Sequence, residues 1–272
     1  MSLPDPTEHR PAVVAVVGDN TIDRFLNDTE QVLVGGNALN VAAQLALAGD
    51  NVGYFGAVAA DADGAVIRNA LKRIALSDEH VVDAEGVTAV TEIRVLDDGD
   101  RVFEREDFGV TAEYFPAGPD LAAIAAADWV HIGMLPRADE LRARIRRLNP
   151  RATISQDLGV SPGIHQLDVA FASAAMLNGI KPDDELVRLR AAGITTAIVT
   201  LGPAGSTGQD ATGRYEQAAA PAEVVDTTGA GDTFIAGFIH ARTRGADLPQ
   251  SLATGAAWAA RTCGHVGGWP QT

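Results

Sequence analysis

The chain has 272 residues, of which 46% are hydrophobic, with a formal net charge of −15 and a single cysteine, Cys263. This length suits one α/β domain over residues 1–272, the negative charge argues against nucleic acid and anionic membranes as partners, and a lone cysteine excludes an intrachain disulfide. Because we also find neither a signal peptide nor an apolar run long enough to cross a bilayer, we expect a cytoplasmic protein.

Short β-rich runs alternate with helical patterns in the N-terminal part of the chain. The first strand is expected at residues 12–18 and another at residues 52–55. Helices are expected at residues 36–48 and 63–74, where apolar residues recur with helical spacing. This alternation predicts βαβ units and parallel strands.

One segment breaks the alternation. Residues 89–96 and 101–108 flank the turn sequence Asp97-Asp98-Gly99-Asp100, which predicts a β-hairpin. Charged residues alternate with apolar ones along both arms, so we expect one covered and one solvent-facing side. On its residues alone, this segment, around residues 88–109, is a hairpin at a sheet edge with no assigned function.

The alternation resumes beyond the hairpin and continues to the end of the chain. The predicted strands are residues 129–132, 153–156, 170–173 and 196–201, and the predicted helices are residues 139–148, 183–192, 230–243 and 249–262. The expected fold is therefore α/β, a doubly wound and mostly parallel sheet flanked by helices.

The segment 225–234 joins a glycine-rich turn to an apolar helix. Its glycines allow the backbone to curl, so that the amides of Gly229, Ala230 and Gly231 point at one place beside the positive end of the helix. Asp232 adds a carboxylate in the first turn. An anion-binding turn next to a carboxylate predicts phosphoryl transfer to a hydroxyl, with Asp232 as the catalytic base; the alternative is an ordinary glycine-rich helix cap.

Two further expectations concern the same turn. We expect Gly231 to need a backbone conformation that excludes β-branched residues, and we expect Asp232 to be a weak base because the helix dipole favours its ionised form. Asp226 and Thr228 either brace the turn or contribute to a monovalent cation site, and the sequence leaves this choice open.

Residues 226–232 resemble the D-T-x-G-A-G-D signature of the ribokinase (PfkB) family of carbohydrate kinases. Gly35-Gly36-Asn37-Ala38-Leu39-Asn40 resembles the second signature of that family, and residues 16–23 resemble its first strand. The resemblance implies a ribokinase-like fold, a sugar substrate, and ATP and Mg²⁺ as cofactors; whether K⁺ is also required stays open. It also implies that the hairpin around residues 88–109 is a small β lid over the sugar site and a homodimer contact, the alternative being an edge hairpin without a function.

The resemblance also implies roles for individual residues. The residues expected to bind the sugar are Asp19, Asp23, Gly35, Gly36, Asn37 and Asn40. The residues expected to bind the nucleotide are Thr200, Gly202, Gly205, Thr228, Gly229 and Gly231, with the segment 263–268 beside the adenine.

One departure from the family pattern concerns magnesium. The family's N-x-x-E motif is expected after the strand at residues 170–173, but no glutamate follows Asn178 by three residues. With this departure, the short chain and the sequences Gly18-Asp19-Asn20 and Gly35-Gly36-Asn37 most resemble the fructoselysine 6-kinase branch. In such a kinase, Asp19 and either Glu104 or Glu106 are expected to favour the protonated amine of the substrate.

Three functions remain open at this point. The first is an ATP-dependent kinase of a fructosamine, the second is a plain sugar kinase for ribose or fructose, and the third is a sugar- or nucleotide-binding protein that has lost catalysis. No Walker A loop is present, no G-x-G-x-x-G follows the first strand, and the six histidines lack metal-ligand spacing. The sequence therefore argues against P-loop, dinucleotide and zinc sites.

Overall fold

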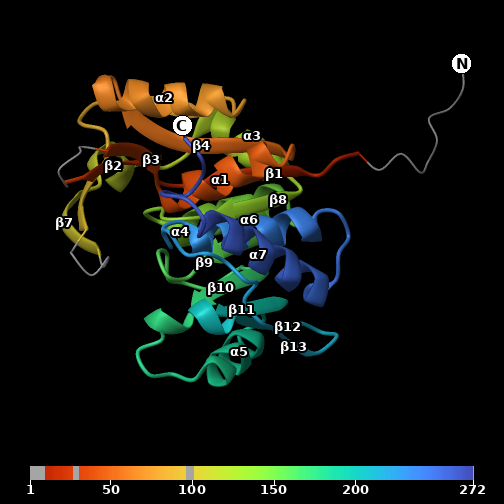
Figure 1. Ribbon diagram of the computed structural model, residues 1–272. Coiled ribbons are helices and arrows are strands. Elements are labelled where there is room, and N and C mark those ends of the chain that lie inside the picture. The colour runs from red at the N-terminus through yellow and green to blue at the C-terminus, as the bar shows by residue number, and fades with distance from the viewer. Residues whose placement is uncertain (1–9, 27–30, 96–100, 272) are drawn as a thin grey trace, which may run out of the picture.

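Two β-sheets organise the chain in the computed structural model, which describes residues 10–26, 31–95 and 101–271 (Figure 1). Among these residues the larger sheet has nine strands. Across the sheet they are β13 (Arg214–Gln217), β12 (Ser206–Gln209), β11 (Thr196–Thr200), β10 (Val169–Ser173), β9 (Thr153–Asp157), β8 (Trp129–Ile132), β1 (Val13–Val17), β4 (Asn51–Ala59) and β5 (Val81–Ala84). All neighbours pair in parallel except β11–β12 and β12–β13, which are antiparallel.

The central strands are continuous apolar runs because both faces of the sheet are covered. In β1, Val16 and Val17 point to opposite faces and both are fully buried. Val16 packs in one hydrophobic cluster and Val17 in another. The two clusters lie on the two sides of the sheet, so the expected doubly wound architecture is confirmed.

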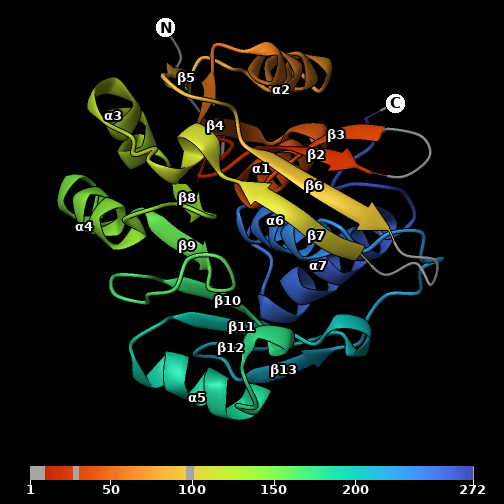
Figure 2. The ribbon, with the colours of Figure 1, turned by 90° about the vertical axis from the view of Figure 1, so that its left-hand side faces the viewer.

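Helices cover both faces (Figure 2). Helices on the first face are α1 (Asn37–Leu47), α2 (Ala62–Arg73), α6 (Ala230–Arg242) and α7 (Leu248–Thr262). Helices on the second face are α3 (Gly118–Ala126), α4 (Ala138–Leu148) and α5 (Pro182–Ala191). Every helix that we predicted is present, with ends shifted by at most one residue, whereas α3 was not predicted.

A second sheet of four strands lies outside these layers. In order it contains β3 (Gln31–Gly35), β2 (Thr21–Phe25), β6 (Val90–Val95) and β7 (Arg101–Asp107). The predicted hairpin is present as β6 and β7, and its expected turn at 97–100 lies outside the described residues. The other half of this sheet, β2 and β3, was not predicted. Phe25, Leu33 and Ile93 form its small apolar cluster.

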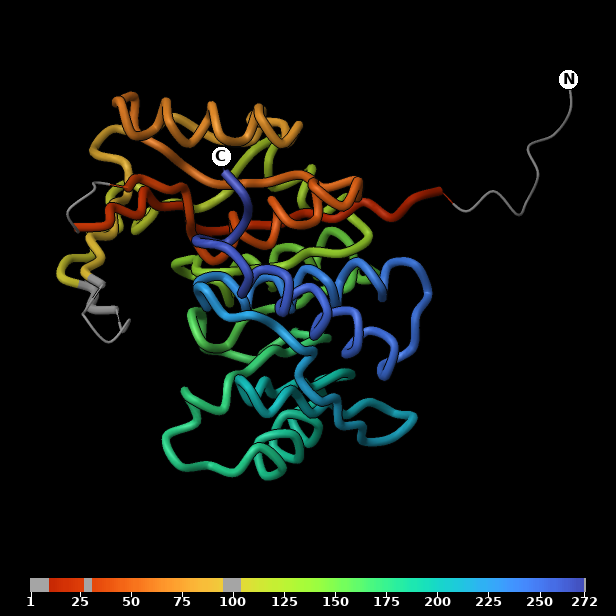
Figure 3. The backbone as a smooth tube through the Cα atoms, viewed as in Figure 1, coloured from red at the N-terminus to blue at the C-terminus, as the bar shows by residue number. Residues whose placement is uncertain are grey.

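The C-terminal segment returns to the N-terminal half of the chain (Figure 3). The side chain of Gln271 pairs with the backbone of Val34 in β3: Oε1 accepts from the amide nitrogen at 2.8 Å and Nε2 donates to the carbonyl oxygen at 2.6 Å. The last described residue therefore holds an edge strand of the four-stranded sheet. Among the described residues, no helix has the length and hydropathy needed to span a membrane.

Candidate active site

Loops and helix starts gather at the carboxyl-terminal edge of the parallel strands. Asp19 follows β1, Asp157 ends β9, and Thr200 ends β11. Helices α1 and α6 begin at the same edge, because the side chain of Asn37, the first residue of α1, donates to Asp157 at the end of β9 and to Asp232 in the first turn of α6. Residues that are far apart in the sequence thereby form one site.

The turn before α6 is tied to the C-terminal segment. Asp226 accepts hydrogen bonds from the amide of Thr228 at 2.7 Å and from the amide of Gly267 at 2.8 Å. Gly229 has φ +72°, and a Cβ at this position would lie 2.5 Å from the Cα of Gly268. Asp226 thus braces the turn, as one of our two alternatives proposed.

The expectation for Gly231 was wrong. Gly231 lies in the first turn of α6, is not among the glycines with positive φ, and no heavy atom lies within 4 Å of the place of its Cβ. The residue that needs a backbone conformation unfavourable for other amino acids is Gly229, which has a positive φ and directly precedes α6.

The carboxylate of Asp232 is held by two amides from α1. Its Oδ1 accepts from Nδ2 of Asn37 at 2.7 Å, and its Oδ2 accepts from Nδ2 of Asn40 at 2.6 Å. Burial raises the pKa of Asp232 to about 8; the bonds from the two amides oppose the rise, and the charges of Asp157 and Asp19 add to it. Our expectation of a weak base was therefore wrong, because burial and like charges outweigh the helix dipole.

Two other carboxylates lie next to this pair of amides. Asp19, which is 8% exposed, accepts from the backbone amides of Asn37 at 2.8 Å and Ala38 at 3.0 Å, so it caps α1. Asp157 accepts from Nδ2 of Asn37 at 2.9 Å and from the amide of Gly159 at 2.8 Å. Burial raises the pKa of both Asp19 and Asp157. The sequence analysis missed Asp157, although its place just after a predicted strand was a usable signal.

A cavity of about 180 Å³ lies between Asp232 and the four-stranded sheet. Of the predicted sugar-binding residues, Asp19, Asp23, Gly36 and Asn40 line it, together with Asp232, Thr228 and Gly229. The sheet contributes a cross-strand row of polar residues, since Asp23 pairs with Thr91 and Thr91 with Glu106 in its register. None of the described residues that line this cavity has a basic side chain.

Two predicted residues lie behind the cavity wall. A Cβ on Gly35 would collide with the carboxylate of Asp23, so Gly35 makes room for that side chain. Asn37 lies beneath the wall and holds Asp232. Asn20, which we did not single out, lines the cavity; its Nδ2 donates to the Tyr54 hydroxyl, and its buried Oδ1 has no hydrogen-bond partner among the described residues.

A larger cavity of about 730 Å³ lies on the other side of the α6 N-terminus. Of the predicted nucleotide-binding residues, Thr200, Gly202, Gly205 and Gly231 line it, as do Ala230 and, on α7, Cys263. Thr228 and Gly229 face the smaller cavity instead. Among the described residues that line the larger cavity, none carries a charged side chain. The backbone amides at the start of α6 are one source of electrostatic stabilisation for a negative ligand there.

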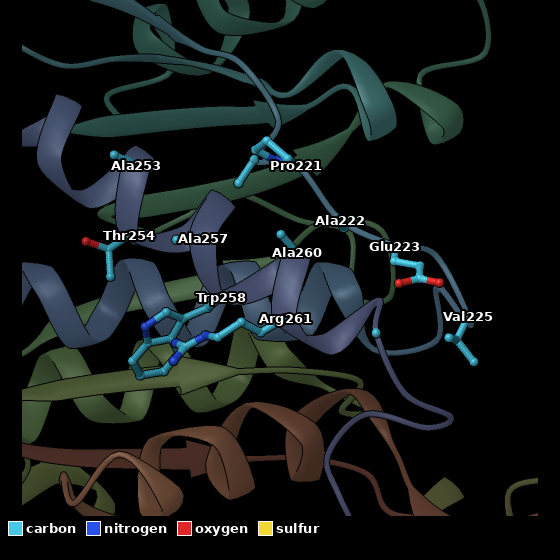
Figure 4. A pocket seen from close by; sticks show the side chains of 12 residues that line it. Pro221, Ala222, Glu223, Val225, Ala253, Thr254, Ala257, Trp258, Ala260 and Arg261 are labelled. Carbon is cyan, nitrogen blue, oxygen red and sulfur yellow. The ribbon is translucent and has the colours of Figure 1, made fainter.

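Beyond the larger cavity, the outer face of α7 carries an open groove of about 920 Å³ (Figure 4). Thr254, Trp258 and Arg261 line it from the helix, and the segment 220–225 forms its other wall. Ala220, Pro221, Ala222 and Ala260 line both the groove and the larger cavity. The segment 220–225 is therefore a partition, and the groove does not reach Asp232.

The structure also bears on metal binding. Asn178, the start of the incomplete N-x-x-E pattern, is exposed and lines neither cavity. In the part of the chain that the structure describes, no group of three or more His, Cys, Asp or Glu side chains is arranged to hold a metal ion.

Comparisons with known proteins show which proteins this chain is similar to. A family model described as pfkB family carbohydrate kinase matches residues 13–145 and 160–270; Asp157 lies between the two stretches. Fructoselysine 6-kinase of Escherichia coli (strain K12) is 35% identical over 266 residues, which cover 94% of this chain and 99% of that protein. Fructosamine kinase FrlD of Bacillus subtilis (strain 168) is 28% identical over 258 residues, covering 92% and 90%.

A solved structure shows the same fold. Ribokinase of Arabidopsis thaliana, complexed with ribose and ATP, matches with a TM-score of 0.85 and 21% identity over 95% of this chain and 94% of that one. The expected ribokinase-like fold and the similarity to fructoselysine 6-kinases are both confirmed.

Proposed function

The chain belongs to the pfkB family of carbohydrate kinases, and we propose that it transfers a phosphoryl group from ATP to a hydroxyl of a fructosamine. One observation carries the proposal: two cavities meet at the N-terminus of α6, and Asp232 faces the smaller one. The smaller cavity suits a polyol, because carboxylates and amides line it. The larger one suits a nucleotide, because it ends at the amides of α6.

The proposed chemistry divides between Asp232 and the turn. Asp232 orients the acceptor hydroxyl and takes its proton as the oxygen–phosphorus bond forms and the bond to the leaving ADP breaks. The amides of Gly229, Ala230 and Gly231 stabilise the charge on the transferring group. A magnesium ion would neutralise phosphate charge, and since the described residues hold no prebuilt metal cluster, the nucleotide phosphates would supply much of its coordination.

Cys263 gives a direct test of the larger cavity. It is the single cysteine of the chain and it lines that cavity. We expect ATP at about ten times its dissociation constant to slow the modification of Cys263 by a maleimide roughly tenfold, because the bound nucleotide covers the thiol. The rate is measured by mass spectrometry, with fructose alone as the control. Equal rates with and without ATP would place the nucleotide elsewhere.

The choice of a fructosamine over a plain sugar has two supports. The relatives named above include a fructoselysine 6-kinase and a fructosamine kinase. Within the described part of the chain, the side chains that line the smaller cavity include five carboxylates and no basic group; the carboxylates are those of Asp19, Asp23, Glu106, Asp107 and Asp232. A protonated amine next to the sugar would be stabilised in such surroundings, whereas neutral fructose gains nothing from them.

Glu106 is the proposed partner of the amine. The carboxylate of Asp19 already accepts hydrogen bonds from two backbone amides of α1, whereas the side chain of Glu106 has no hydrogen bond or ion pair within the described part of the chain. Glu104, two residues earlier on β7, pairs with Arg94 and does not line the cavity. The two glutamates therefore form a matched pair for mutation.

We expect kcat/KM for a fructosyl-amino acid to exceed that for fructose by at least roughly tenfold. Glu106→Gln should narrow this ratio, because the charge facing the amine is lost, while Glu104→Gln should leave it unchanged. ADP release is measured with a panel of fructosamines, fructose and ribose. Equal or better turnover of a free sugar would favour a plain sugar kinase, and no turnover of any compound would favour a binding protein.

A further inference from the structure

Asn37 connects three carboxylates that come from three different segments. Its backbone amide donates to Asp19, and its side-chain nitrogen donates to Asp157 and to Asp232. We propose that Asp157 is a positioning residue for the reaction: through the shared amide of Asn37 it sets the orientation and the charge state of Asp232. This inference rests on the proposed role of Asp232 as the base.

When both carboxyl groups are ionised, the shared amide has one favourable orientation. Nδ2 of Asn37 carries two hydrogens, and each goes to one carboxylate, at 2.9 Å to Asp157 and 2.7 Å to Asp232. A flipped amide would place its oxygen against two acceptors. Oδ1 of Asn37 is buried without a hydrogen-bond partner among the described residues and lies beside Gly133. The side-chain oxygen of Asn37 thus lacks a hydrogen bond, whereas both hydrogens of its side-chain nitrogen are donated to carboxylates.

Asp157 is itself held firmly. Its second oxygen accepts from Gly159, and its carbonyl oxygen accepts from the amide of Ser161 at 3.1 Å. The carbonyl of Ser161 accepts from the buried side chain of Gln156, which in turn accepts from the buried guanidinium of Arg142. The position of Asp157 therefore does not depend on Asp232.

The charged side chains of the described residues that face Asp232 are all carboxylates. Asp157 lies at the end of β9 and Asp19 after β1, and Asp23 on β2 and the β7 pair Glu106 and Asp107 share its cavity. Of these, Asp157 and Asp232 share one hydrogen-bond donor, and the charge of Asp157 adds to the raised pKa of Asp232, so we expect their protonation steps to be coupled. Burial raises the pKa of each, which is the condition under which such coupling is strong.

Asp157→Asn tests the proposal, because it removes the charge and keeps one oxygen that can accept from Asn37, at the cost of the bond from the amide of Gly159. We expect the acidic limb of the kcat/KM pH profile to move down by about one pH unit, since Asp232 then ionises without a charged neighbour. Asp184→Asn, on the exposed face of α5, removes the same charge and should leave the limb in place. Asp157→Glu, which keeps the charge, should stay near the wild-type profile.

An unchanged limb in folded Asp157→Asn, or an equal shift in Asp184→Asn, overturns the proposal. If Asp157→Asn does not fold, carbon-13 NMR titration of the wild-type aspartate carboxyls decides instead. Two signals that share a two-step titration support the coupled pair, and two independent single-step curves overturn it. Failure of the proposed base is distinguishable, because it would appear as an active Asp232→Asn enzyme whatever Asp157→Asn does.

Discussion

Asp232→Asn is expected to lower kcat by about 10²–10⁴-fold with little change in nucleotide affinity. Asparagine keeps the size of the side chain but cannot accept the proton of the acceptor hydroxyl. It also presents an amide to Asn37 or Asn40, each of which donates to Asp232 in the wild type. Steady-state kinetics give kcat, and calorimetric titration gives the affinity for ATP. If the variant keeps more than about a tenth of wild-type kcat, Asp232 is not the catalytic base but only a helix-capping residue.

The pH dependence gives this experiment its control. Because the pKa of Asp232 is raised to about 8, wild-type kcat/KM should increase with pH up to that value, and the residual activity of the variant should not. Stability should change in the opposite direction. The folded carboxyl keeps its proton to about pH 8 and the unfolded one releases it near 3.8, so rising pH in this window lowers the free energy of unfolding. Asp232→Asn should make Tm less dependent on pH.

Gly229→Ala is expected to lower kcat/KM by about 10²–10³-fold, the range seen when one anion-binding amide is lost. Alanine is strained at φ +72°, and its Cβ would lie 2.5 Å from the Cα of Gly268, so the turn must move. Kinetics and thermal unfolding measure the two effects.

Gly231→Ala is the matched control for that variant. Its methyl group meets no heavy atom within 4 Å, so its Tm should remain close to that of the wild type. If both alanine variants lose a similar amount of Tm, the conclusion that glycine is needed at position 229 and not at position 231 is contradicted.

Local patterns explain which elements were predictable. The strands β1 and β11 are unbroken apolar runs because both faces are buried, and β8 was predicted at its observed limits. β2 carries Asp23 and Arg24 in its centre and faces a ligand cavity on one side, so it has no comparable run. Such segments form strands because of their pairing with neighbouring strands in the sheet, and their own residues do not indicate a strand.

The parts of the site that are formed by residues close together in the sequence could be predicted. The turn and Asp232 are encoded within a few residues, and the structure places them beside both cavities. The nearness of Asp157 depends on how β9 packs relative to α1, and the raised pKa of Asp232 depends on burial and on charges from other segments. Neither property is present in the motif itself.

The C-terminal segment supports both binding sites at once. Gly267 holds the turn through Asp226, and Gln271 holds β3 of the lid-like sheet through Val34. We expect a displacement of β3 that carries Gln271 with it to move residues 267–271 and the turn before α6 as well. The affinities for the proposed sugar and nucleotide would then be thermodynamically linked, with the same magnitude whichever ligand binds first.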